Sequence, residues 1–358
     1  MKDQIFHGDS LKVLKTFPNE SIDCIVTSPP YYGLRDYEVE GQIGMEKRFD
    51  EYLSNLLLIT AELKRVLKKS GTLWWNHGDN YSSSPPGNSL DQQSKRLHEG
   101  DGVYGRRLQR NRGKNFRFDQ YKLRAAVTPE KSLVLQNYRL AIRMVDKQGW
   151  ILRNQVIWHK PNCMPESVRD RFTVNFEPVF FFVKSKKYYF DQDAVSEPIT
   201  DSSTIRLLQN VEQQKGSARA NGGTKTNGNM KAVARKDFSP LMGGGGTSFK
   251  NHSGYRNDRG EYLLRPYRNK RAVWTIPIKP FSEAHFAVFP EGLVQTPILA
   301  GCPVNGLVLD PFMGAGTTAL VAKKLQRRFV GIELNKEYIK IAYKRLAQGF
   351  IWDDILTP

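Results

Sequence analysis

Short apolar runs near both ends of the chain alternate with segments in which apolar side chains recur at helical spacing. Between residues 51 and 68, positions such as Leu53, Leu56 and Leu63 predict an amphipathic helix that Gly71 brings to an end. Strands alternating with helices favour a parallel sheet, and hence a doubly wound α/β fold. Strands are expected at residues 5–9, 23–27, 72–76, 155–158, 177–184, 307–309 and 329–333, and helices at 10–15, 51–68, 132–148 and 319–325, with another beginning at 289–293.

Two segments break this pattern, at residues 79–125 and 195–270. The first contains a Ser/Pro-rich stretch and then dense Arg and Lys with interleaved aromatic residues. The second is rich in Gly, Asn and Ser, which is typical of a solvated linker. Its basic residues nevertheless alternate with tyrosines, as in nucleic-acid contact surfaces. The predicted contact residues in the two segments are Arg110, Arg112, Lys114, Arg117, Arg256, Arg259, Arg265 and Arg268, and Lys160 joins them from the end of a predicted strand.

The composition of the chain limits the chemical class of its binding partner. The 358 residues include 54 Lys and Arg against 36 Asp and Glu, a formal net charge of +18, which favours a polyanion over a small neutral metabolite. No apolar run approaches the roughly 20 residues that span a membrane, and no signal peptide opens the chain, so we expect a cytoplasmic protein without a membrane partner. The three cysteines are too scattered for a metal cluster or a disulfide framework, and no metal site is predicted.

Two motifs carry the candidate chemistry. Thr27-Ser28-Pro29-Pro30-Tyr31 follows an apolar strand, and Asp310-Pro311-Phe312-Met313-Gly314-Ala315-Gly316 lies between a strand and a helix. Glycines let the backbone approach a nucleotide-type ligand, and Glu333 at the end of the next strand can accept ribose hydroxyls. Gly316 is followed by Thr317-Thr318, which excludes a phosphate-binding loop ending in Gly-Lys-Ser/Thr. Taken singly, these features also fit an ordinary tight turn, a solvated carboxylate and a proline-stiffened loop.

Together, and in this order along the chain, the motifs resemble the β-class of S-adenosylmethionine-dependent DNA amino-methyltransferases. The resemblance covers roughly residues 1–80, 150–195 and 272–348. It implies a Rossmann-like, doubly wound, mostly parallel methyltransferase sheet with a small basic target-recognition region inserted. Residues 1–194 would form the catalytic half with a basic insertion at about 82–125, residues 195–271 a partly flexible target-recognition region, and residues 272–358 the cofactor-binding half.

The resemblance also implies roles for single residues. Ser28 and the carbonyl of Pro29 would accept the two hydrogens of the target amino group, Pro30 would stiffen the loop, and Tyr31 would stack on an extruded base. Asp9 would meet the cofactor, although it equally suits a helix N-cap. The predicted cofactor-binding residues are Asp9, Phe286, Pro290, Asp310, Pro311, Phe312, Gly314, Gly316, Thr317 and Glu333.

The predicted function is transfer of a methyl group from S-adenosyl-L-methionine to the N4 amino group of cytosine in double-stranded DNA, within a restriction-modification system. Ring-carbon methylation is set aside because it needs a Pro-Cys pair, which neither Cys163 nor Cys302 supplies. Serine before the two prolines is typical of the N4 group, while adenine-N6 enzymes more often carry Asp or Asn, and N6 remains the alternative. An RNA amino-methyltransferase and a non-catalytic nucleic-acid-binding relative are weaker alternatives. A cognate restriction endonuclease acting separately is a possible partner, and the protein is expected to be a monomer or homodimer.

Overall fold

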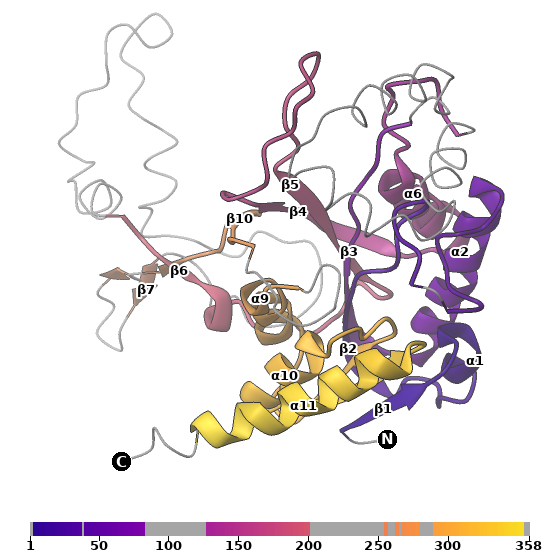
Figure 1. Cartoon of the computed structure of the whole chain (residues 1–358). Helices are drawn as coiled ribbons and strands as arrows, with labels where there is room; N and C mark the ends of the chain where they lie inside the picture. The colour runs from indigo at the N-terminus through magenta and orange to yellow at the C-terminus, as the bar shows by residue number, and fades with distance from the viewer. Residues whose placement is uncertain are drawn as a thin grey trace, which may run out of the picture. The chain divides into compact units, whose positions relative to one another are not determined.

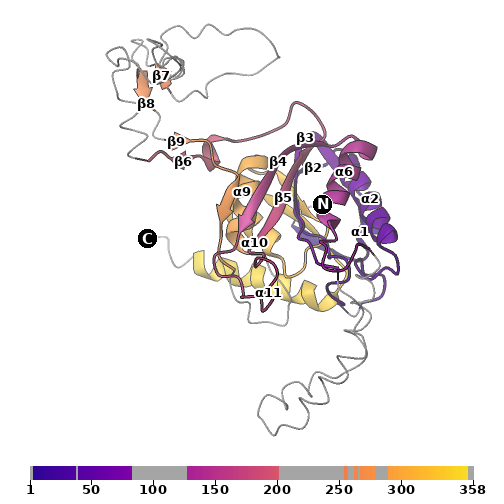
Figure 2. The same ribbon diagram turned by 90° about the horizontal axis from the view of Figure 1, so that it is seen from above.

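The computed structural model describes residues 3–37, 39–82, 127–200, 254–256, 262–264, 267–278 and 289–353. The chain divides into two compact units. One comprises Met1–Asp191 together with Arg271–Pro358, and the other comprises Gln192–Lys270. Figures 1 and 2 label most of the elements in each unit.

The larger unit is built on one eight-stranded sheet. Strand β5 runs antiparallel to both of its neighbours, β3 and β4. All the other neighbouring strands of this sheet are parallel to each other. The expected mostly parallel α/β fold is therefore confirmed. The strands, in spatial order, are β1 (Gln4–His7), β12 (Arg328–Glu333), β11 (Leu307–Asp310), β2 (Ile22–Thr27), β3 (Leu67–Asn76), β5 (Phe176–Val183), β4 (Ile151–His159) and β10 (Val273–Thr275).

Helices cover both faces of this sheet, as the two views in Figures 1 and 2 show. One face carries α1 (Ser10–Leu14), α2 (Phe49–Val66) and α6 (Gln136–Gln148), and the other carries α9 (Glu291–Gly301), α10 (Thr317–Lys324) and α11 (Lys336–Asp353). Helix α2 buries one side, where Leu53, Leu56 and Leu63 are fully buried at helical spacing, whereas α10 is buried at six consecutive positions, 317–322. The core beneath the helices includes Trp75, Trp150 and Phe180.

The largest departures from the predicted element boundaries are at the starts of β3, α6 and β4. Helix α2 ends at Val66, and β3 already begins at Leu67, because Leu67 pairs with Ile22 in the sheet. Helix α6 begins at Gln136 rather than at residue 132, since Leu135 has a left-handed backbone with φ 58° that interrupts a helix. Strand β4 begins at residue 151 rather than 155 and ends at residue 159. Its exposed first residues still pair with β5, across a register shift between Leu152 and Asn154.

The smaller unit contains two short antiparallel pairs. Strand β6 (Glu197–Pro198) pairs with β9 (Tyr267–Arg268), and β7 (Gly254–Arg256) pairs with β8 (Tyr262–Leu264). A 3₁₀ turn, Asp193–Val195, precedes β6. The assignment of this unit as a target-recognition region stays a prediction. Within the parts of the chain that the structure describes, no helix is long and apolar enough to cross a membrane.

Candidate active site

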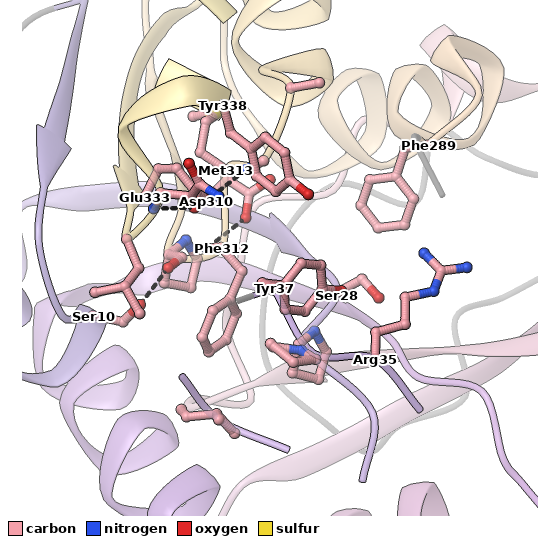
Figure 3. Close-up of a pocket in the computed structure, with 18 of the residues that line it drawn as sticks. Ser10, Ser28, Arg35, Tyr37, Phe289, Asp310, Phe312, Met313, Glu333 and Tyr338 are labelled. Carbon is pink, nitrogen blue, oxygen red and sulfur yellow. Dashed lines mark hydrogen bonds between the residues drawn. The ribbon is translucent and has the colours of Figure 1, made fainter. Parts of the chain in front are cut away.

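The candidate site lies at the edge of the sheet where the parallel strands end. Strand β5 also brings residues to this edge, because it runs in the opposite direction and begins there. Ligands of open α/β sheets bind at this carboxyl edge. A cavity of about 480 Å³ occupies it. Figure 3 shows Ser10, Asp310, Phe312 and Glu333 on one side of the cavity, and Ser28, Arg35 and Tyr37 on the other.

Asp310, the last residue of β11, ties the two motifs together. Its buried carboxylate accepts hydrogen bonds from the hydroxyls of Thr27 (2.6 Å) and Thr318 (2.7 Å) and from the backbone N–H of Phe312 (3.0 Å). Thr27 directly precedes Ser28, so the first motif is anchored on the second. Burial raises the pKa of Asp310 to about 6, and the three hydrogen bonds oppose this rise.

The glycine loop, residues 310–316, needs two of its glycines for backbone reasons. Gly314 and Gly316 have φ values of 52° and 78°, in the left-handed region that glycine adopts at little cost. A Cβ atom on Gly316 would lie 2.7 Å from the Cβ of Ala342 in α11. The loop can therefore pack this closely against α11 only if residue 316 has no side chain.

Glu333, the last residue of β12, anchors the glycine loop through a hydrogen bond to its backbone. Its Oε2 accepts a hydrogen bond from the N–H of Gly314 (2.7 Å), and its Oε1 accepts one from the N–H of Asn335 (2.8 Å). Burial raises the pKa of Glu333, and these backbone hydrogen bonds oppose the rise. Each carboxylate oxygen keeps further acceptor capacity toward a ligand, because it has two lone-pair directions.

Asp9 and Ser10 border the same cavity from the end of β1. Asp9 is the N-cap of α1, since its Oδ1 accepts a hydrogen bond from the N–H of Lys12 at 2.8 Å. The neighbouring Ser10 hydroxyl donates to the carbonyl of Pro311 at 2.5 Å. The helix-capping interpretation of Asp9 is thus correct, and the capping carboxylate still lines the cavity.

A buried network holds the backbone of the Ser-Pro-Pro-Tyr loop, residues 28–31. The hydroxyl of Tyr52 lies 3.0 Å from the carbonyl oxygen of Pro30 and 3.0 Å from Nε2 of His77. Nε1 of Trp75 donates to the other ring nitrogen of His77 at 3.4 Å. Burial lowers the pKa of His77 to about 3, so the ring is neutral, and this pattern of contacts assigns its proton to Nε2. His77 then donates to Tyr52, which donates to Pro30.

A second series of contacts runs from Ser28 along the wall of the cavity, since Tyr31, Glu177 and Lys160 also line it. The Tyr31 hydroxyl donates to Oε2 of Glu177 at 2.9 Å, and the Ser28 hydroxyl lies 3.4 Å from the Tyr31 oxygen. The ammonium group of Lys160 forms an ion pair with Oε1 of Glu177. Burial, and after it the charge of Glu177, raises the pKa of Tyr31 well above its usual range. Tyr31 therefore keeps its hydroxyl proton at neutral pH.

The loop after the first motif forms another wall of the cavity. Within the described part of residues 33–43, Gln42 accepts a hydrogen bond from the N–H of Tyr37 (2.7 Å) and donates to the carbonyl of Arg35 (3.2 Å). The Tyr37 ring packs edge-on against Tyr338 of α11, with ring centroids 6.3 Å apart. This loop therefore connects the Ser-Pro-Pro-Tyr side of the cavity with α11.

Most of the residues predicted from sequence meet at the cavity. Gly316 and Pro290 lie outside its lining, as the N-caps of α10 and α9. Arg256 lies in β7 and Arg268 in β9, where the Arg268 guanidinium is 3.6 Å from Glu197. Phe286, Arg110, Arg112, Lys114, Arg117, Arg259 and Arg265 lie outside the described residues. The lining includes Asp9, Ser28, Pro29, Pro30, Tyr31, Lys160, Asp310, Pro311, Phe312, Gly314, Thr317 and Glu333.

Several lining residues were not found from the sequence. Asn76 is the last residue of β3, and Glu177 is the second residue of the reversed strand β5. Their positions would have indicated the site if the direction of every strand had been known. Tyr338 also lines the cavity, but it belongs to no motif and reaches it through the packing of α11. Phe289 lines it too, next to the predicted Pro290 and just before α9.

The order of the sheet, its reversed strand β5 and the cavity at its carboxyl edge define an α/β domain of the Rossmann-like methyltransferase type. A model of the N6/N4 DNA methylase family matches residues 22–344. The chain therefore belongs to this family, and the resemblance drawn from its motifs is confirmed. It is a DNA methyltransferase.

Characterised relatives match over nearly the whole chain. The type II methyltransferase M.Cfr9I of Citrobacter freundii is 36% identical over 96% of this chain and 87% of its own length. M.SmaI of Serratia marcescens is 34% identical over 96% and 90%. Among solved structures, the cytosine-N4-specific PvuII DNA methyltransferase aligns over 96% of this chain and 86% of its own, with a TM-score of 0.55 and 19% identity. TTHA0409 of Thermus thermophilus, complexed with S-adenosyl-L-methionine, aligns over 97% and 93%, with a TM-score of 0.51 and 20% identity. These two likenesses establish the shared fold.

Proposed function

We propose that this protein is a type II modification enzyme that transfers the methyl group of S-adenosyl-L-methionine to the N4 amino group of cytosine in double-stranded DNA. The observation that carries the proposal is the meeting of two motifs at one cavity. Strands β2 and β11 are neighbours, and the hydrogen bond from Thr27 to Asp310 places Ser28 beside the glycine loop. A base acceptor and a nucleotide-type cradle thereby share one space.

The glycine-loop side of the cavity fits the cofactor. A volume of about 480 Å³ suits a ligand of this size. Phe312, Met313 and Tyr338 offer apolar and aromatic surface for an adenine ring and a thioether chain, while Glu333 can accept ribose hydroxyls. When bound, S-adenosyl-L-methionine supplies an electrophilic methyl group on a positively charged sulfur. The carboxylates of Asp310 and Glu333 give this part of the cavity a negative potential that suits the charge.

The first motif can activate an exocyclic amino group. The nitrogen of such a group is a poor nucleophile, because its lone pair is delocalised into the base. Two acceptors directed at its hydrogens favour the geometry in which that lone pair is free. The Ser28 hydroxyl is one acceptor and the carbonyl of Pro29 is the other. Among the described residues no donor is found for the Pro29 carbonyl, whereas the Pro30 carbonyl is engaged by Tyr52.

The choice of cytosine N4 rests on Ser28, because a serine in front of the two prolines is typical of that group. Adenine N6 is the alternative, since the family includes both activities and a hydroxyl can accept from either amino group. A base must leave the duplex to reach the cavity, and the ring of Tyr31 offers it a stacking surface.

Recognition of the DNA sequence is assigned, in the same proposal, to the unit Gln192–Lys270 and to the basic insertion at about 82–125. The formal net charge of +18 supports a surface that contacts phosphates. In this unit Glu197 lies 3.6 Å from both Arg268 and Lys270, which keeps these two cations together on one segment. A modification enzyme of this kind protects sites from an endonuclease that acts separately.

The test is the identity of the methylated base. Unmethylated plasmid DNA is incubated with the protein and S-adenosyl-L-methionine, digested to nucleosides and analysed by mass spectrometry. N4-methyldeoxycytidine is the expected product. N6-methyldeoxyadenosine would establish the alternative instead, and a folded, cofactor-binding protein that yields neither nucleoside from any DNA would refute the proposal.

A further inference from the structure

We propose that Glu177 and Lys160 are positioning residues that act through Tyr31 to turn the hydroxyl proton of Ser28 away from the target base. The proposal rests on methyl transfer to an exocyclic amino group, and it holds for cytosine and adenine alike. It gives Lys160 a role other than the DNA contact predicted from sequence.

The direction of each hydrogen bond follows from counting protons. A carboxylate has none, so Glu177 accepts from the hydroxyl of Tyr31 at 2.9 Å. Tyr31 has a single hydroxyl proton, which this bond uses, so its oxygen is left as an acceptor toward Ser28. A hydrogen bond between the two hydroxyls, 3.4 Å apart, must therefore use the proton of Ser28. Contacts of this length are common in catalytic sites before substrate binds and tighten in the complex.

The pair is held in place by the sheet. Glu177 of β5 lies opposite Trp158 of β4, and Lys160 follows β4 by one residue. The side chains of Lys160 and Glu177 are only 16% and 19% exposed, and the ammonium group of Lys160 lies 4.4 Å from the centroid of the Trp158 ring. Gly78 leaves the space for this arrangement, since a Cβ there would be 2.8 Å from the Tyr31 ring and 3.2 Å from the Glu177 carboxyl carbon.

The consequence concerns what Ser28 presents to a base. With its proton turned toward Tyr31, the Ser28 oxygen faces the cavity with lone pairs only. An amino group carries two hydrogens and can donate one to this oxygen. The carbonyl oxygen of thymine or guanine at the same position is itself an acceptor, so the two oxygens repel each other. The partly buried Lys160–Glu177 pair thus favours amino-bearing bases through Tyr31 and Ser28.

Glu177→Gln tests this, because glutamine has the same shape but can donate. Its amide can donate to the Tyr31 oxygen, which frees the tyrosine proton to point at Ser28 and reverses the series. We expect the single-turnover rate of methyl transfer to fall about 10- to 100-fold, the range for hydrogen bonds that involve a charged group. Affinities for S-adenosyl-L-methionine and for DNA, and the melting temperature, should stay at wild-type values.

A matched control comes from the other end of β5. Lys184 pairs with Glu20 at 3.1 Å on the edge of the sheet opposite the cavity, so Glu20→Gln makes the same chemical change and should leave the rate unchanged. If Glu177→Gln alone lowers the melting temperature by stranding the charge of Lys160, the Lys160→Met/Glu177→Gln protein removes both charges together. It should still be slow.

The double variant Ser28→Ala/Glu177→Gln separates positioning from general structural support. If Glu177 acts through Ser28, this protein transfers methyl groups no more slowly than Ser28→Ala alone. The proposal would be overturned if the double variant were slower than Ser28→Ala by the full factor seen in Glu177→Gln. It would also be overturned if Glu177→Gln transferred methyl groups at the wild-type rate. The wild-type rate, measured in the same experiment, distinguishes failure of the proposed function from failure of the positioning role. A wild type without transfer overturns the proposed function as well, whereas equal rates in wild type and Glu177→Gln overturn only the positioning role.

Discussion

Replacing Gly316 by alanine tests the glycine loop most directly. The backbone of Gly316 has φ 78°, a conformation that costs an alanine on the order of 1 kcal/mol. The added Cβ would also lie 2.7 Å from the Cβ of Ala342 and 3.1 Å from its Cα. Both atoms belong to the rigid part of α11, so relief requires a shift of the loop or of the helix.

The size of the effect follows from these two terms. Forcing one extra methyl group into a packed interior costs about 1–3 kcal/mol, which adds to the backbone term for a total of roughly 2–4 kcal/mol. For a unit of this size that corresponds to a fall in Tm of roughly 5–15 °C. A loop displaced from α11 also moves Gly314 and its bond to Glu333, so we expect S-adenosyl-L-methionine to bind about 10-fold more weakly, a loss of about 1.4 kcal/mol.

Calorimetric titration with the cofactor, thermal melting and DNA binding by fluorescence anisotropy together check this expectation, and DNA affinity should be unchanged. Gly41→Ala is the stability control. Gly41 has a similar φ of 82° but no atom within 4 Å of an added Cβ, so it carries the backbone term alone and should melt only a few degrees below the wild type. A Gly316→Ala protein that melts no lower than Gly41→Ala and binds the cofactor normally would show that this loop shape is not required.

Further predictions concern the other parts of the site. Ser28→Ala should slow single-turnover methyl transfer by roughly 10²-fold while the cofactor still binds, and a wild-type rate would exclude Ser28 from the reaction. Alanine in place of the four arginines at positions 256, 259, 265 and 268 should flatten the salt dependence of DNA binding by about 0.9 in log–log slope for each phosphate that is no longer neutralised, whereas an unchanged slope would make this segment a tether. The pKa of Asp310 is about 6 in the folded protein and 3.8 when exposed, so the folded state binds this proton more tightly and gains stability as the pH falls. Relative to Asp310→Asn, the wild type should gain about 1 kcal/mol in free energy of unfolding between pH 7 and pH 5 in denaturant titrations, and parallel pH profiles would contradict the assignment.

The fold was largely predictable because its signals are local. The apolar runs ending at Thr27, Asp310 and Glu333 are found as strands in the sheet, and the periodicity of α2 indicated its buried face. The boundary between α2 and β3 was misplaced because the contact that decides it is not local. Leu67 suits a helix end and a strand start equally well, and its pairing with Ile22, which only the folded sheet supplies, decides between them.

The site was predictable wherever it is written into a continuous motif. Ser28 and Gly314 could be predicted because their sequence neighbours form recognisable motifs, at residues 27–31 and 310–316. Glu177 does not, because it reaches the cavity only through the reversal of β5, and a strand's direction cannot be deduced from its composition. Tyr338 is an ordinary helical residue until the packing of α11 brings it against Tyr37.

The pairing of β2 with β11 has a consequence for how the protein is made. Thr27 and Asp310 are 283 residues apart in the chain, yet they share a hydrogen bond. At synthesis rates of about 5–20 residues per second, β2 waits roughly 15–60 s before its neighbour leaves the ribosome. Strand β1 waits as well, since its partner β12 comes still later in the sequence. The nascent chain therefore exposes unpaired strand edges until β11 and β12 have been made, and methylation can begin only after that point.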